Sequence, residues 1–289
     1  MSEDLKRDHV QSIERCLAVI EAFTGHAGGM SFSELASATG LSKPTVRRIL
    51  LTLEALGYAR SVGSRFALTP RVLDLGYAYL SSLNLTSVAH PVMEALTDQL
   101  RESTALSALD GVDVVYLNRV HRHRISSLGL AVGTRLPAHA TSSGHVLLAD
   151  LPPEAIADYF SKADLKPLTN RTLTTKSALL DRLKKVRARG WDIVDQELEI
   201  GRISAAAPIR DANGAVVAAL SFSCGSIERS VEEIADQVLP LLMASAEQIS
   251  GAIGGSGYAQ RNRNEHAARN GDSKLPRKVA SRPKETKWT

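Results

Sequence analysis

The sequence has few of the features that mark secreted, membrane or redox proteins. Its 289 residues include only two cysteines, Cys16 and Cys224, which form neither a CxxC pair nor a disulfide framework. We expect both to be small core residues. No apolar run approaches the roughly twenty residues that a membrane span needs. The charged start, residues 1–6, lacks the apolar segment of a secretory signal, so the expected location is the cytoplasm, without a membrane partner.

Common catalytic and nucleotide-binding motifs are absent as well. The chain contains no G-x-S-x-G elbow, no P-loop, no G-x-G-x-x-G and no H-E-x-x-H pattern. His121 and His123 alternate, but no Cys, Asp or Glu lies near them at the spacing of metal ligands. We therefore expect no cofactor, no metal site and no enzyme activity.

The positive charge is concentrated near one end of the chain. The net charge is +4, but residues 255–289 contain nine basic and three acidic side chains, so the preceding residues are slightly negative. This tail is rich in Asn, Lys, Arg, Ser and Pro, a composition that predicts disorder. Its charge could attract phosphates without specificity, or it could only aid solubility, and both interpretations stay open.

Residues 31–68 predict two short helices and a small hairpin. Ser31 and Glu34 have the spacing of a capping box, so a helix begins near Ser31. It ends at Gly40, which tolerates the left-handed conformation of a tight turn. Ser42 then caps a second helix. Its apolar residues recur at three- and four-residue spacing and form one buried stripe of Val46, Ile49, Leu50 and Leu53.

The outward face of this second helix is basic. Arg47 and Arg48 lie opposite the buried stripe, with Lys43 and Thr45 at the N-terminal end. Arg and Lys can donate to guanine or to phosphate, as they do on the recognition helix of a helix-turn-helix. A solvated basic face without a partner is the alternative for an isolated helix. The hairpin that follows favours the DNA-binding interpretation.

Two short strands, 58–62 and 65–68, surround the pair Gly63-Ser64, which suits a type II′ turn. Arg60 and Arg65 would lie on this wing, near a phosphate backbone. The predicted winged helix-turn-helix spans residues 1–69. Its candidate DNA-binding residues are Ser42, Lys43, Thr45, Arg47, Arg48, Arg60 and Arg65.

Helices are expected on both sides of this unit. Upstream, apolar residues at helical spacing predict a first helix with one side in the core. Downstream, Thr69-Pro70 predicts an N-cap followed by proline at the first helical position, and hence a linker helix over 70–84. A helical linker would couple two domains, whereas a Gly/Ser linker would uncouple them. The upstream core residues are expected to be Val10, Ile13, Leu17 and Ile20.

Residues 85–254 predict a second domain of the mixed α+β class. A long helix through residues 88–100 comes first, and strand pairs around two Asp- and Gly-containing turns then alternate with helices. The expected strands are 104–109, 112–120, 125–130, 203–209 and 216–223. A loop is expected at 131–140, and further helices are expected after Ser142 and at 153–160, 177–189 and 231–253.

Five stretches have the order and spacing of a family pattern: 10–15 (VQSIER), 40–50 (GLSKPTVRRIL), 56–58 (LGY), 133–144 (GTRLPAHATSSG) and 187–191 (RARGW). Through them the chain resembles the IclR family of bacterial transcriptional regulators. The resemblance implies a winged helix-turn-helix, a connecting helix and a GAF-like mixed α/β domain that binds a small metabolite. It also implies a homodimer or tetramer that binds palindromic double-stranded operator DNA.

In this family the effector pocket is formed by the loop before a helix and by facing strands. The resemblance assigns Ser204 on one late strand, and Ser221 and Ser223 on the next, where both hydroxyls face one side and can donate to one carboxylate. Ordinary strand and cap serines are the alternative. Where some members have an acidic pocket residue, this chain has Val194, with Asp195 beside it. The helix start that could bind an anion is assigned to Thr141, Ser142, Ser143 and Gly144.

The stretch 119–125 (RVHRHRI), with Arg135 and His139, resembles the branch that controls aromatic-acid and β-ketoadipate catabolism. It implies a small carboxylate effector, because Arg can bind a carboxylate through two parallel hydrogen bonds. A solvated basic loop is the alternative for residues 121–124.

Two other functions stay open for the whole chain. One is a winged-helix regulator whose C-terminal domain binds a sugar phosphate. Such a domain would need more Lys and more Gly-rich loops than this chain has. The other is an enzyme with an appended DNA-binding domain.

Overall fold

The computed structural model describes residues 9–76, 85–121 and 131–254, and the chain divides into two compact units, Met1–Leu83 and Asn84–Thr289. Some predictions lie outside the described residues. These are the second half of the linker helix (77–84), most of the basic loop and the strand that follows it (122–130), and the basic tail (255–289).

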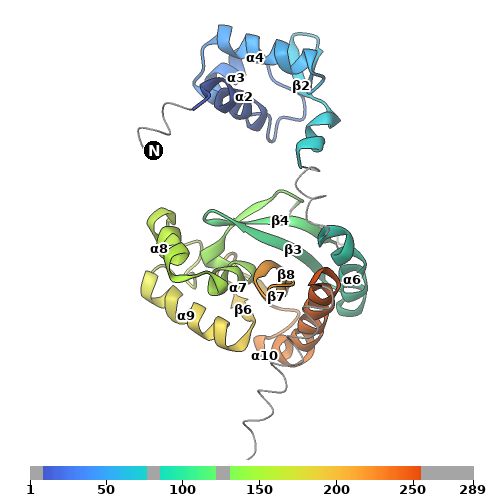
Figure 1. The fold of residues 1–289 in the computed structure, drawn as a ribbon, viewed down its shortest axis with the longest axis vertical. Helices are drawn as coiled ribbons and strands as arrows, with labels where there is room; N and C mark the ends of the chain where they lie inside the picture. The colour runs from blue at the N-terminus through green and yellow to red at the C-terminus, as the bar shows by residue number, and fades with distance from the viewer. Residues whose placement is uncertain (1–8, 77–84, 122–130, 255–289) are drawn as a thin grey trace, which may run out of the picture. The chain divides into compact units, whose positions relative to one another are not determined.

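The first unit is a winged helix-turn-helix (Figure 1). Its elements are α2 (Gln11–Glu21), α3 (Phe32–Thr39), α4 (Lys43–Ala55), β1 (Ala59–Val62) and β2 (Arg65–Leu68). The capping box of Ser31 and Glu34 is present, Gly40 has a left-handed φ of 69°, and Ser42 caps α4. Gly63 has the positive φ that a type II′ turn needs at its first central residue. The predicted elements between residues 31 and 68 are therefore confirmed.

The first helix packs through a different face from the one predicted. Val19 and Phe23 are buried in the core of this unit. In contrast, Val10, Ile13 and Leu17 are 55%, 59% and 49% exposed. Of the predicted set only Ile20 packs against the core. Because α2 has apolar residues on two sides, its spacing alone does not decide which side meets the core.

Glu34 and Arg65 join α3 to the wing. The Glu34 carboxylate accepts from the Ser31 backbone N–H at 2.8 Å and lies 2.9 Å from Arg65 Nη2. The Arg65 guanidinium also donates to the Gly29 carbonyl, at 3.0 and 3.2 Å. The Ser31 backbone hydrogen bond is the main cause that lowers the pKa of Glu34 to about 2, with further contributions from the Ser31 hydroxyl and Arg65. Arg65 thus connects the wing to the start of α3 through contacts inside the protein.

The described start of the linker differs from a regular helix. Residues Pro70–Val72 form a 3-10 turn (η1), and residues 73–76 are helical. Thr69 occupies the predicted N-cap position, but its hydroxyl donates to the Gly57 carbonyl instead of capping the turn.

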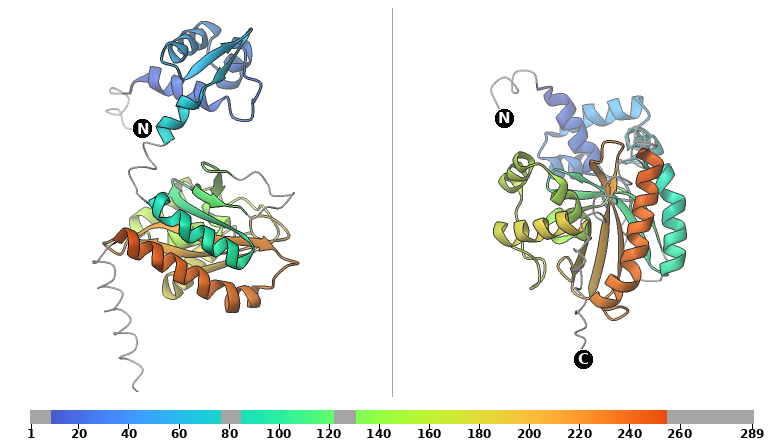
Figure 2. Two further views of the ribbon diagram at one scale, coloured as in Figure 1. Left: turned by 90° about the vertical axis from the view of Figure 1, so that its right-hand side faces the viewer. Right: turned by 60° about the horizontal axis from the view of Figure 1, so that its bottom comes forward.

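The described part of the second unit is an antiparallel sheet between two layers of helices. Its strands are β3 (Ser103–Asp110), β4 (Asp113–Val120), β5 (Arg135–Pro137), β6 (Asp192–Asp195), β7 (Arg202–Arg210) and β8 (Val216–Gly225), in the order β5-β4-β3-β8-β7-β6. Its helices are α6 (Leu85–Leu100), α7 (Ser142–Asp150), α8 (Pro153–Lys162), α9 (Lys176–Arg189) and α10 (Val231–Glu233), which continues through a π-helical turn, η3 (Ile234–Val238), to residue 254. Figure 2 shows α6 and the C-terminal helix side by side on one face of the sheet, while α7, α8 and α9 cover the other.

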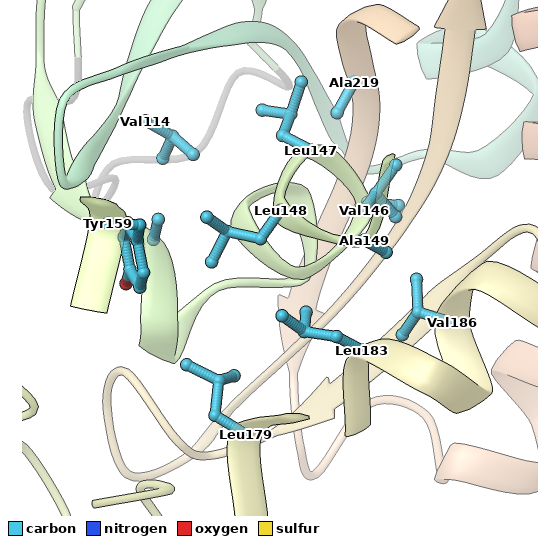
Figure 3. Close-up of a cluster of buried hydrophobic side chains, with 12 residues drawn as sticks. Val114, Val146, Leu147, Leu148, Ala149, Tyr159, Leu179, Leu183, Val186 and Ala219 are labelled. Carbon is cyan, nitrogen blue, oxygen red and sulfur yellow. The ribbon is translucent and has the colours of Figure 1, made fainter. Parts of the chain in front are cut away.

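Helix α7 lies at the centre of the core on its face of the sheet (Figure 3). Its residues from Ser142 to Ala149 are all buried. A Cβ atom on Gly144 would lie 2.1 Å from the Ala138 carbonyl oxygen, so the short helix η2 (Ala138–Ala140) packs directly on α7. This dense packing fixes the start of α7 in place. The side chains around it include Val114, Tyr159, Leu179, Leu183, Val186, Ala206 and Ala219.

Two edge strands of this sheet were not predicted. β5 and η2 occupy residues 135–140, where a loop was expected, and β6 is a four-residue strand after Gly190. Both strands are short, and β6 has no alternation because both of its faces are covered. The other strands and helices predicted for residues 85–121 and 142–254 are confirmed.

Candidate functional site

A cavity of about 310 Å³ lies between the sheet and the N-terminus of α7 in the second unit. This volume is near the lower end of the roughly 300–1,000 Å³ that is typical of small-molecule sites, so it suits a small metabolite. The predicted effector residues that line it are Thr141, Ser142, Ser143, Ser204, Ser221 and Ser223.

Strand pairing forms the floor of this cavity. Ser223 of β8 is paired with Ser103 of β3 on one side and with Ser204 of β7 on the other. Ser221, two residues earlier on β8, faces the same side and lies between two alanines. The three paired serines, Ser103, Ser223 and Ser204, are called the serine row below. Beside the serine row lies a second row, formed by Ala105, Ser221 and Ala206. The small side chains of this second row leave room for a ligand.

The start of α7 forms one wall of the cavity. Thr141 Oγ1 accepts from the Gly144 backbone N–H at 3.1 Å and caps the helix. Ser142 Oγ donates to Ser204 Oγ at 3.0 Å, so the wall and the floor are joined. The first backbone N–H groups of a helix lack acceptors within the helix, and the helix dipole favours an anion near them. The wall and the floor together supply donors for an anionic oxygen.

Four predicted effector residues do not line the cavity. Arg135 pairs with two aspartates, at 2.7 and 3.2 Å, and a hydrogen bond to the first of these, Asp110, is the main cause that raises its pKa. His139 Nε2 hydrogen-bonds to a backbone carbonyl at 3.1 Å. Asp195 forms an ion pair with Arg171. Gly144 permits the close packing of η2 on α7. These four residues therefore lie outside the lining of this cavity.

The cations of the cavity were not assigned to the effector site one by one, although Arg119 begins the predicted basic stretch 119–125. Arg119 and Arg202 line the cavity, together with Tyr116 and Glu199. The pairing of β4 with β3 skips Leu117, which makes a β-bulge. Because the bulge shifts the alternation of β4, Tyr116 and Arg119 both face the cavity although they are three residues apart.

These side chains make one end of the cavity positive. Arg202 Nε lies 3.1 Å from Glu199 Oε2. Burial lowers the pKa of Arg119, and the like charge of Arg202 also lowers it. Burial raises the pKa of Tyr116, against the opposing effect of both arginines. Side chains from β4 and β7 therefore contribute charge to the same cavity.

A network of buried charges lies behind α7. His145 and Asp192 are completely buried, and His145 Nδ1 donates to Asp192 at 2.6 Å. His145 Nε2 donates to the His139 carbonyl at 2.7 Å. Asp192 also contacts Arg182, at 3.1 Å, and Arg189. Both ring nitrogens of His145 therefore lie against acceptors, a carboxylate on one side and a backbone carbonyl on the other.

This network connects elements of the fold and does not have the geometry of a hydrolytic Ser-His-Asp triad. A Ser-His-Asp hydrolase needs the second histidine nitrogen near a hydroxyl, whereas Nε2 of His145 is bonded to a backbone carbonyl. Arg182 Nη2 also lies 3.0 Å from Glu197, whose pKa is raised chiefly by burial. Glu197 precedes the cavity residues Leu198 and Glu199. The network thus connects α7 and α9 to the segment between β6 and β7.

The predicted DNA-binding residues are mostly on the surface of the winged helix. Lys43, Arg47 and Arg48 on α4 are exposed, as is Arg60 on β1. Ser42 is exposed and Thr45 partly so, and their hydroxyls lie 2.8 Å apart. Arg65 is half-buried in the contacts with Gly29 and Glu34 described above. The surface of α4 therefore provides most of the candidate contacts.

The described residues contain neither a cluster of metal ligands nor a membrane-spanning helix. No group of three or more His, Cys, Asp or Glu side chains could hold a metal ion there. None of the helices in the same ranges is long and apolar enough to cross a membrane.

A winged helix with an exposed basic helix, in one chain with a domain whose cavity is lined by apolar side chains and by a group of hydroxyls, defines the class of ligand-binding DNA regulators. Comparison with family models agrees. Residues 12–63 match the IclR helix-turn-helix domain, and residues 77–251 match the C-terminal domain of bacterial IclR transcriptional regulators. The chain belongs to the IclR family of bacterial transcriptional regulators.

Its relatives include regulators of aromatic-acid catabolism. The chain is 42% identical over 245 residues to the Pca regulon regulatory protein of Pseudomonas putida, covering 84% of each. It is 34% identical over 258 residues to the p-hydroxybenzoate hydroxylase transcriptional activator of Acinetobacter baylyi, covering 87% of this chain and 95% of the relative. A crystal structure of an IclR homologue from Microbacterium hydrocarbonoxydans, complexed with 4-hydroxybenzoate, matches 85% of this chain and 100% of its own, with a TM-score of 0.75 and 28% identity.

Proposed function

We propose that this transcriptional regulator responds to a small carboxylate effector of aromatic catabolism, which binds in the cavity of the second unit. The observation that carries the proposal is the set of donors around that cavity: the serine row, Ser221, the start of α7 and two arginines. The names of its relatives and the 4-hydroxybenzoate bound to its structural neighbour support the same ligand class.

A carboxylate fits the polar side of this cavity. Its two oxygens are acceptors only, and the hydroxyls of Ser221 and Ser223 can donate to one of them. The first backbone N–H groups of α7 can donate to the other. The rest of the ligand would lie against Val114, Leu136 and Val194, which also line the cavity. Val194 is apolar where some family members have an acid, which favours an anionic ligand here.

Calorimetry on the full chain with a panel of aromatic acids, dicarboxylates and sugar phosphates tests this proposal. We expect binding of at least one carboxylate, with a raised melting temperature because a ligand that binds only the folded state stabilises it. Binding of a sugar phosphate alone would overturn the carboxylate proposal.

The basic face of α4 and the wing would bind one half of an operator. We expect Arg48→Ala to weaken operator binding by about 1–3 kcal/mol and to leave effector affinity unchanged. Quantitative gel shifts measure the first quantity and calorimetry the second. Lys184→Ala, which removes an exposed positive charge from the second unit, is the control for general electrostatic attraction. An unchanged gel-shift affinity for Arg48→Ala would remove this residue from the DNA contacts.

A palindromic operator would require at least two copies of the chain. The exposed apolar side of α2, with Val10, Ile13 and Leu17, favours contact with a second copy, because large exposed apolar patches mark interaction sites. We propose a homodimer or tetramer on this basis.

We expect Ile13→Glu with Leu17→Glu to lower the mass measured by analytical ultracentrifugation toward the 31.1 kDa of one chain. Ile227→Glu is the matched control, because Ile227 is 98% exposed and lies in the second unit. An unchanged mass for the double variant would place the contact between copies elsewhere.

A further inference from the structure

Gln196 has an unusual backbone conformation close to the cavity. Its φ is 59°, in the left-handed region that a residue with a Cβ atom rarely adopts. Among the described residues, Arg101 is the one other non-glycine residue with a positive φ. Its N–H donates to the Thr97 carbonyl at 2.8 Å, as is common just after a helix. Gln196 instead follows a strand, β6. A conformation of this kind persists only where the surrounding structure holds it.

Hydrogen bonds from several segments hold Gln196 in this conformation. Its backbone N–H donates to the Arg202 carbonyl at 2.9 Å, and its own carbonyl accepts from Thr169 Oγ1 at 2.7 Å. Its side-chain Oε1 accepts from the Gly201 backbone N–H at 2.9 Å, while Nε2 donates to Asp195 Oδ1 at 3.0 Å. A single side chain thus connects the two ends of the turn between β6 and β7.

This turn, residues 196–201, forms part of the cavity wall. Leu198 and Glu199 on the turn, and Arg202 directly after it, are lining residues. Gln196 itself does not line the cavity. Its hydrogen bonds can therefore act on a ligand only through the positions of the lining residues. A wall that is already in place before the ligand binds strengthens binding, because no ordering cost remains.

We infer that Gln196 is a positioning residue of the cavity: its side-chain hydrogen bonds and its left-handed backbone keep the turn 196–201 in the shape that binds a ligand. This inference rests on the proposed function, in which the cavity binds a carboxylate, and adds a residue that acts without touching that ligand. Without these hydrogen bonds the turn would relax, and affinity would fall in proportion to the fraction of molecules that keep the binding shape.

Replacement of Gln196 by methionine tests this role on the full chain, because methionine has a similar length but cannot form either side-chain hydrogen bond. Without ligand, we expect amide hydrogen exchange in peptides that span the turn to approach the rate of an unstructured chain. Calorimetry with benzoate, with adipate and with the tightest-binding carboxylate of the panel should show several-fold weaker binding. Saturating ligand should restore slow exchange, because it binds the ordered turn and shifts the population toward it.

Two further variants separate this role from a general effect of substitution. Thr169→Val removes the hydroxyl that donates to the Gln196 carbonyl and keeps the shape of the side chain. We expect the same changes in exchange and affinity, in smaller measure. Gln248→Met is the matched control, because Gln248 is exposed on the C-terminal helix, and it should change neither quantity.

Two results for Gln196→Met would overturn the inference while the carboxylate proposal stands. Exchange as slow as in the wild type would show that the turn does not depend on this side chain. Fast exchange with unchanged affinities would show that the cavity does not depend on the turn. Failure of the wild type to bind any carboxylate would overturn the proposed function and this inference together.

Discussion

Replacement of Asp192 by alanine is expected to destabilise the second unit by about 3–5 kcal/mol, the usual cost of removing one partner from a buried ion pair. Asp192 is completely buried and contacts His145, Arg182 and Arg189. Without its carboxylate, Nδ1 of His145 would lose its hydrogen-bond partner in the interior, and Arg182 and Arg189 would lose the anion that they share. The expected loss is a large part of the roughly 5–15 kcal/mol that stabilises a typical domain.

Urea unfolding, followed by the fluorescence of Trp191, measures this loss. A Trp288→Phe background leaves Trp191 as the single tryptophan. Asp195→Ala is the matched control, because Asp195 lies on the same strand and also pairs with an arginine, but both partners are partly exposed. We expect that control to change the free energy of unfolding by about 0–1 kcal/mol. A similarly small change for Asp192→Ala would show that the buried network does not hold α7 in place.

The winged helix could be predicted from the sequence because its signals are local. Ser31, Gly40 and Ser42 act on backbone groups within three or four residues of themselves, and Gly63 acts within one turn. The choice of core face on α2 is different. Ile13 and Val19 both belong to apolar stripes at helical spacing, and only the contact with α3 and α4 decides that Val19 is buried.

The cavity could be predicted in part. Alternation along β8 correctly placed Ser221 and Ser223 on one face, and the same rule applied to β7 would have placed Arg202 beside Ser204. Arg119 could not be found in this way, because the bulge that turns it toward the cavity depends on how β4 pairs with β3.

The partners of polar residues were the hardest part to predict. His145 and Asp192 are 47 residues apart, and nothing in either local sequence links them. Arg135 was assigned to the effector site because it lies in a matching stretch, but its aspartate partners come from the hairpin of β3 and β4. A charge near a pocket in sequence therefore indicates a site only after its partners are known.

Joint replacement of Ser221 and Ser223 by alanine is expected to abolish the response to the effector and to leave the DNA affinity of the ligand-free protein unchanged. Each hydrogen bond to a charged group contributes about 1.5–3 kcal/mol, so the loss of two should weaken effector binding by about a hundred-fold or more. Ser221 Oγ donates to the Ala105 carbonyl at 3.3 Å in the described structure. This long hydrogen bond can yield to a charged ligand.

Calorimetry with the tightest-binding carboxylate of the panel, and operator gel shifts with and without it, measure these effects. Ser107→Ala is the matched control, because Ser107 lies on the adjacent strand β3 but does not line the cavity. Its buried hydroxyl has no hydrogen-bond partner among the described residues, so its removal should change neither the response nor the fold. If the double variant and the wild type gave overlapping ligand titrations, the effector would bind outside this cavity. If the double variant also lost DNA binding, the two serines would be required for the fold and not only for the ligand.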